Sequence, residues 1–221
     1  MDLHFEVFWV VWPALLRGAL NSLVLIVAVM VLSTIIGLII AFGLNSRIGW
    51  FRQIVSGCSW VARGIPPLML LFVVFLALPQ IGIVLSPYVA ATTGMTMYIS
   101  FYFAEAFSAG MRGIPKEQRQ AAAALALPRG RTFRRVIFPQ MLPAVLPSYF
   151  SRATEVVKGT AIAAVVAYPE LALAAKQSLT VTFRPIEVLC MVGVVYLVAN
   201  GLLIWLQVIF ERRSERRGGR A

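Results

Sequence analysis

Long stretches without a charged residue constrain this chain more than any other feature. No charge occurs in residues 20–44, 64–104 or 188–210. A helix needs about 20 apolar residues to cross a bilayer, so each stretch is long enough to cross. Charged residues make up only 13% of the chain, about half the share usual in soluble domains. We therefore predict an all-α integral membrane protein, because backbone groups in lipid must bond to one another.

The uncharged stretches and their interruptions predict five crossings within one transmembrane domain, residues 1–221. The stretch 64–104 is too long for one helix, and the Pro and Gly residues in "LPQIG" and "LSPYV" mark a turn inside it. Pro139, Pro143 and Pro147 predict that the fourth crossing is bent or broken where it begins. The crossings are expected at roughly 20–44, 54–78, 88–111, 144–168 and 188–210.

The placement of positive charge predicts the orientation. The net charge is +11, and the basic residues gather in loop 47–52, in the central segment 112–135 and in the tail 211–221. Five crossings put these segments on one side, which the positive-inside rule assigns to the cytoplasm, with the N-terminus outside. A soluble protein this basic would suggest a nucleic-acid partner, but the membrane pattern explains the charge and none is expected. Cys58 and Cys190 are isolated, so no metal site is expected.

The central loop, about residues 113–143, reads "GIPKEQRQAAAALALPRGRTFRRVIFPQMLP". Long connections tend to be functional. Pro115 favours a helix start, residues 116–127 are good helix formers, and "PRG" at 128–130 ends the helix. Its small side chains, Ala121, Ala122, Ala123, Ala124 and Ala126, allow another surface to approach closely. Two interpretations fit: a docking helix for a cytoplasmic partner, or a surface helix on its own bundle whose basic residues meet lipid phosphates.

The loop resembles the "EAA" loop of ABC importer permeases, in which Glu-Ala-Ala is followed at fixed spacing by Gly, Ile and Leu-Pro. Ala121, Ala122 and Pro139 match, while Gln120, Ala126, Val136 and Phe138 replace the Glu, Gly, Ile and Leu. The flanking "GIPKEQ" and "TFRRVIFPQ" resemble the polar amino acid (His/Glu/Gln/Arg/opine) permeases. "RGIPPL", "YFAE", "VVKGT" and "YPELALAAKQ" extend this resemblance over residues 18–177.

The resemblance implies a bacterial inner-membrane permease with the type I importer fold, dimeric with itself or a similar chain. A coupling helix, with Gln120, Ala121, Ala122, Ala123, Ala126 and Pro139 in its loop, would seat in a dimer of cytoplasmic ATP-binding subunits. ATP and Mg would bind to those subunits, so this chain would have no catalytic residue and no cofactor of its own; it contains no Gly-rich phosphate loop. An extracytoplasmic solute-binding protein would deliver an amino acid or related compound.

Charged residues within predicted crossings are candidates for the substrate pathway, because such charges usually face a cavity or a partner. They are Arg63, Glu105, Arg152, Glu155 and Lys158. Arg63 would lie in the interior or reach the cytoplasmic interface. Glu105 would either hold neighbouring helices together or contact the substrate. One helical face carries Arg152, Glu155 and Lys158. They would either bind a zwitterionic substrate or form salt bridges with one another.

Other classes of function remain open at this stage. A stand-alone ion-coupled transporter would use the intramembrane charges, but this chain has a single set of helices and a long basic loop. A membrane scaffold would have no use for those charges. An ABC permease whose specificity lies wholly in the solute-binding protein is the nearest alternative. Two residues favour neutral polar or acidic amino acids as substrates of a site within the membrane. The family commonly has Asp after the Lys, where this chain has Gly159, and the guanidinium of Arg152 suits a carboxylate.

Overall fold

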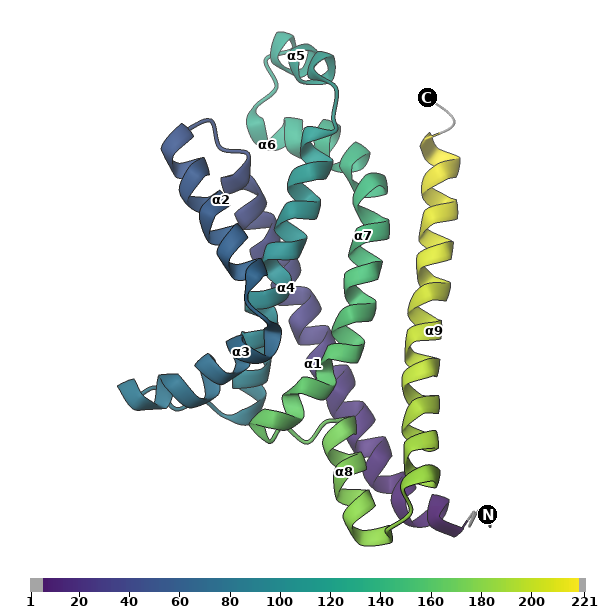
Figure 1. Cartoon of the computed structure of the whole chain (residues 1–221). Helices are drawn as coiled ribbons and strands as arrows, with labels where there is room; N and C mark the ends of the chain where they lie inside the picture. The colour runs from purple at the N-terminus through teal and green to yellow at the C-terminus, as the bar shows by residue number, and fades with distance from the viewer. Residues whose placement is uncertain (1–5, 219–221) are drawn as a thin grey trace.

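The computed structural model describes residues 6–218, which form helices without any strand (Figure 1). The termini themselves, Met1 and Ala221, lie outside the described residues. The elements are α1 (Glu6–Leu44), α2 (Gly49–Gly64), α3 (Pro67–Phe72), η1 (Val73–Ala77), η2 (Leu78–Ile81), α4 (Pro87–Arg112), α5 (Lys116–Ala124), α6 (Arg129–Thr132), η3 (Phe133–Ile137), α7 (Phe138–Gly159), η4 (Thr160–Val166), α8 (Leu171–Thr182) and α9 (Pro185–Gly218). All-helical architecture is thus confirmed.

The described helices support a multi-pass membrane protein. By length and apolar composition, α1 and α9 can each cross a membrane, and two bent helix pairs raise the number of candidate spans to as many as four. The helix α4 runs along the middle of the bundle (Figure 1) but is not among these candidates. The first residues of α1 and the last turns of α9 lie at opposite ends of the bundle, as an odd number of crossings requires. The count of five stays a prediction.

The second predicted crossing, 54–78, is not one straight helix. The chain turns by 99° between α2 and the segment Pro67–Ile81, and α3 points away from the bundle (Figure 1). Ile65 and Pro66 are extended at this break. A proline disfavours the helical conformation of the residue before it, so Pro66 and Pro67 end α2 and begin α3.

The start of the fourth predicted crossing is continuous helix, and the bend predicted there stays a prediction. Residues 129–166 form one helical unit, in which Pro143 and Pro147 lie inside α7. The π-helical turn η3 ends at Ile137, two residues before Pro139. Local π adjustments let membrane helices keep their prolines by giving freed backbone groups new partners. A bend of 58° separates this unit from α8.

The core is built around the close approach of α1 and α4. A Cβ placed on Gly37 of α1 would lie 2.8 Å from the Cβ of Phe103 and 2.9 Å from the carbonyl oxygen of Ser100. Only glycine therefore allows this separation of the two helices. The Phe103 ring is fully buried and stacks on Tyr149 of α7, with ring centroids 4.6 Å apart. Together these contacts hold α1, α4 and α7 as one unit that carries the charged residues.

Candidate functional site

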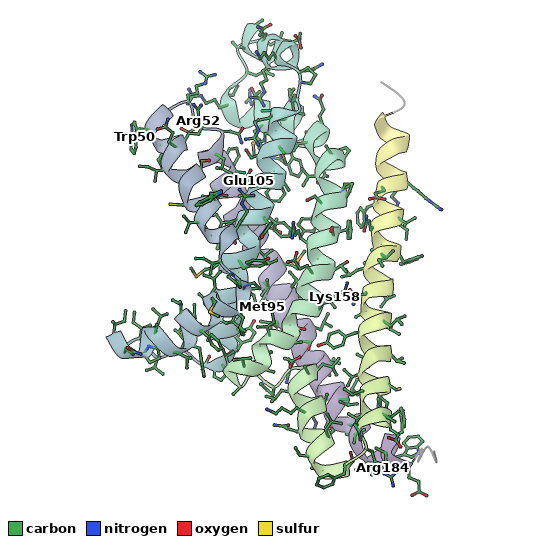
Figure 2. All side chains as sticks on the ribbon, in the orientation of Figure 1. Trp50, Arg52, Met95, Glu105, Lys158 and Arg184 are labelled. Atoms are coloured by element: carbon green, nitrogen blue, oxygen red, sulfur yellow. The ribbon has the colours of Figure 1, made fainter. Side chains whose placement is uncertain are left out.

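An ion pair joins Arg63 of α2 to Glu105 of α4, and Glu105 is labelled in Figure 2. The Arg63 Nη2 lies 3.1 Å from Glu105 Oε1, which also accepts a hydrogen bond of 3.1 Å from the Ser59 hydroxyl. Both charged side chains are about one-third exposed, at 32% and 30%. Arg63 therefore points to the neighbouring helix α4. Glu105 holds two helices together, which favours its interpretation as a packing anchor.

Tyr102 links this pair to α7. Its hydroxyl donates to the Arg63 carbonyl oxygen at 3.2 Å, one of the carbonyls freed where α2 ends. The guanidinium carbon of Arg152 lies 4.1 Å from the centre of the Tyr102 ring. An arginine over an aromatic face is attracted by the ring's negative face. One tyrosine thus contacts groups from both α2 and α7.

The second ion pair lies within α7. Arg152 Nη1 donates to Glu155 Oε2 at 2.5 Å, as their spacing of three residues predicts. The Tyr98 hydroxyl donates to the other carboxylate oxygen of Glu155 at 3.2 Å and lies 3.4 Å from the Tyr102 hydroxyl. Both oxygens of Glu155 therefore have a partner, and its position is fixed from two helices.

A cavity of about 670 Å³ opens beside this network. Its walls come from α3, α4, α7, η4 and α9, and the polar or charged side chains among them are Tyr98, Ser151, Thr154, Glu155, Lys158 and Gln207. Pockets of about 300–1,000 Å³ with a few polar groups are typical of small-molecule sites. Of the predicted pathway residues, Glu155 and Lys158 line the cavity, whereas Arg63, Glu105 and Arg152 do not.

Lys158 does not join a ladder with Arg152 and Glu155, although its spacing suggests one. In the described part of the chain, the ion pairs are Arg63–Glu105 and Arg152–Glu155, and Lys158 belongs to neither. Its side chain extends from α7 toward α9 (Figure 2). The cavity wall therefore presents one cation that has no acidic partner within 4.0 Å among the side chains of residues 6–213.

The loop helix α5 lies at one end of the molecule, away from the bundle centre (Figure 1). It begins after Pro115 as predicted, but it ends at Ala124 rather than continuing to residue 127. Ala126 has a left-handed backbone with φ of 50°. Its N–H bonds to the Ala123 carbonyl, and the Leu127 N–H bonds to the Ala122 carbonyl. This is the Schellman ending in which glycine is usual.

The alanines of the loop do not share one surface. Ala122 is buried, at 3% exposed, and packs inside the chain, so it cannot belong to an outward docking face. Gln120, Ala121, Ala123 and Ala126 are exposed, as is Leu125 at 73%. Arg119 Nη2 donates to the Met111 carbonyl oxygen in the last turn of α4. The other predicted loop residue, Pro139, lies in the first turn of α7.

Reasoning from charged residues alone missed the tyrosines. Tyr98, Tyr102 and Glu105 lie on α4 within two helical turns, and each hydroxyl has a partner in the network. In the sequence, Tyr98 and Tyr102 are four residues apart in an uncharged stretch, and this spacing could have indicated a shared polar contact. Gln207 of α9 and Ser59 of α2 carried no such signal, because only the packing of distant helices brings them near the cavity or the ion pair.

Comparison with known proteins identifies relatives along nearly the whole chain. The histidine/lysine/arginine/ornithine transport system permease protein HisQ of Escherichia coli (strain K12) is 31% identical over 209 residues, covering 87% of this chain and 91% of the relative. The arginine transport system permease protein ArtQ of Bacillus subtilis (strain 168) is 28% identical over 96% of this chain and 98% of its own length. The substrates in these names are those of the relatives.

Solved structures show the same arrangement of helices. A chain from the crystal structure of an amino acid ABC transporter with histidines superposes with a TM-score of 0.86 at 27% identity, covering 96% of this chain and all of that chain. A chain of the MetNI methionine ABC transporter gives 0.79 at 18% identity, which supports the fold alone. Residues 33–216 match the family described as binding-protein-dependent transport system inner membrane component. The chain therefore belongs to this family and is the membrane permease component of an ABC importer, whose ATPase is a separate subunit.

Proposed function

We propose that the permease carries polar amino acids or related compounds, and that they pass through the cavity beside Tyr98, Glu155 and Lys158. This proposal rests on one observation: an acidic side chain, Glu155, and a basic side chain, Lys158, line the same cavity in an apolar bundle. The relatives HisQ and ArtQ are named as amino acid transport permeases, which supports this substrate class.

In this proposal Glu155, which lines the cavity, binds the ammonium of the substrate. Arg152, its ion-pair partner, does not line the cavity in this structure and turns toward it to bind the α-carboxylate of the substrate. The Arg152 bond to Glu155 uses Nη1, and a guanidinium has five N–H donors, so further donors serve the substrate. An unpaired charge within a crossing costs about 2.5–3.5 kcal/mol on insertion scales. A pair that is satisfied within α7 avoids this cost when the cavity is empty. Arg63 and Glu105 support the site through Tyr102.

The chain works with partners in this proposal. The exposed face of α5, with Gln120, Ala121 and Ala123, docks in a groove of a cytoplasmic ATP-binding subunit, and Pro139 and Ala126 set the shape of the loop. A dimer of these subunits binds ATP and Mg and drives the helices by closing. A second copy of this chain, or a similar permease, completes the membrane part, and an extracytoplasmic solute-binding protein delivers the substrate. The N-terminus is outside and the basic tail 211–221 is cytoplasmic.

Charge-neutralising variants test the membrane site. Arg152→Gln, Glu155→Gln and the double variant are compared for amino acid uptake and substrate-stimulated ATPase activity in the reconstituted complex. A substrate site predicts that each single variant changes apparent affinity or preference while assembly is retained. If the single variants misassemble but the double variant assembles and transports normally, the pair is only a structural bridge. Specificity then lies in the solute-binding protein.

A further inference from the structure

We infer that this cavity selects substrates that carry one more negative than positive charge, with Lys158 binding a second carboxylate. The chemical class is an amino acid with an acidic side chain. This inference rests on the proposed function, because it assigns a substrate class to the same cavity. It differs from the cationic substrates in the names of the relatives.

The first argument is the balance of charge. The intramembrane network has three cations, Arg63, Arg152 and Lys158, and two acids, Glu105 and Glu155. Each acid is paired with an arginine, at 3.1 Å and 2.5 Å, which leaves Lys158 as the excess charge on the cavity wall. On α9, Glu211 accepts a hydrogen bond of 2.9 Å from Gln207 and does not line the cavity.

The second argument is position along α7. Glu155, Lys158 and Gly159 lie within about one helical turn of one another, and all line the cavity. An amino acid whose ammonium is at Glu155 therefore extends its side chain toward Lys158. A carboxylate at the end of that side chain completes the pairing with Lys158, whereas an ammonium or guanidinium there meets a like charge on the cavity wall. Like charges placed together are strongly unfavourable.

The third argument is the space at Gly159. A Cβ added there would meet only the Cε of Met95, at 3.6 Å, which is ordinary contact with the end of a flexible side chain. The backbone of Gly159 is right-handed helical, with φ of −69° and ψ of −19°, so any residue fits. The position has room for an acid beside Lys158, and the chain has none. Met95 and Lys158 are both labelled in Figure 2.

The test measures binding of glutamate, glutamine and arginine to the purified permease–ATPase complex without the solute-binding protein. The wild-type complex should bind glutamate about tenfold more tightly than arginine. Lys158→Gln should weaken glutamate binding by about tenfold and leave glutamine within about threefold, whereas Lys158→Arg should retain the glutamate preference. Lys176→Gln, which removes an exposed cation of α8 outside the cavity, is the matched control.

A second experiment places an acidic residue at position 159 to reverse the order of ligand preference. Gly159→Asp should make arginine the preferred ligand, while Gly159→Asn, of the same size without the charge, should keep the wild-type order. Equal or tighter arginine binding by the wild-type complex overturns the inference, as does an equal loss of all three ligands in Lys158→Gln. If none of the three amino acids binds to the wild-type complex, the membrane site itself is refuted, and with it the proposed pathway.

Discussion

Replacing Gly37 with alanine should separate the two central helices. The new Cβ would lie 2.8 Å from Phe103 Cβ and 2.9 Å from Ser100 O, whereas ordinary contacts begin near 3.4 Å. Neither atom can move by a rotamer change, because one is a Cβ and the other belongs to the backbone. The helices must therefore move apart by about 0.6 Å or bend, and overpacking of this kind costs about 1–3 kcal/mol. We expect about 2 kcal/mol.

The assay is thermal unfolding of the purified permease in detergent, followed by the fraction that elutes as a single species after heating. Gly201→Ala in α9 is the matched control, because nothing lies within 4 Å of a Cβ added there. In a helix, alanine is preferred to glycine by about 0.8–1.0 kcal/mol, so the control should be as stable as the parent or more stable. Equal midpoints for Gly37→Ala and Gly201→Ala would refute the close approach of α1 and α4.

Other perturbations test the loop and the topology. Ala123→Trp should keep the permease stable and abolish co-purification of the ATPase, whereas Ala122→Trp should destabilise the permease itself, because Ala122 is buried; intact ATPase recovery with Ala123→Trp contradicts the docking face. Ala126→Gly should raise thermal stability by up to about 1 kcal/mol, because the left-handed backbone at φ of 50° is strained for alanine; a lower midpoint argues against that backbone. A cytoplasm-active reporter fused after Ala221 should give signal and a periplasm-active reporter should not, and the opposite result overturns the predicted orientation.

Local spacing predicted the features that depend on neighbouring residues. The helix start after Pro115 and the pairing of Arg152 with Glu155 needed only helix geometry. The long uncharged stretches predicted an all-helical membrane fold, which the relatives and the structure confirm.

Features set by distant contacts were not predictable in the same way. Pro66 and Pro67 separate α2 from α3, but the angle of 99° depends on how α3 packs on α4, where Leu71 fills the space above Gly94. The role of Arg63 as the partner of Glu105 depends on a contact between residues 42 apart in the sequence. Ala122 is buried although its neighbours in the sequence are also alanines. An alanine repeat has no periodic pattern that distinguishes its inner from its outer face.

The two ion pairs make different demands during synthesis of the protein. Arg152 and Glu155 are three residues apart and neutralise each other as soon as α7 forms. Arg63 and Glu105 are 42 residues apart, so α2 must leave the ribosome and approach the membrane before its acidic partner on α4 exists. During that interval Arg63 carries an uncompensated charge that costs about 2.5–3.5 kcal/mol at a helix centre. We therefore expect stable insertion of α2 to require α4, so that this part of the chain enters the membrane as a group of helices rather than one at a time.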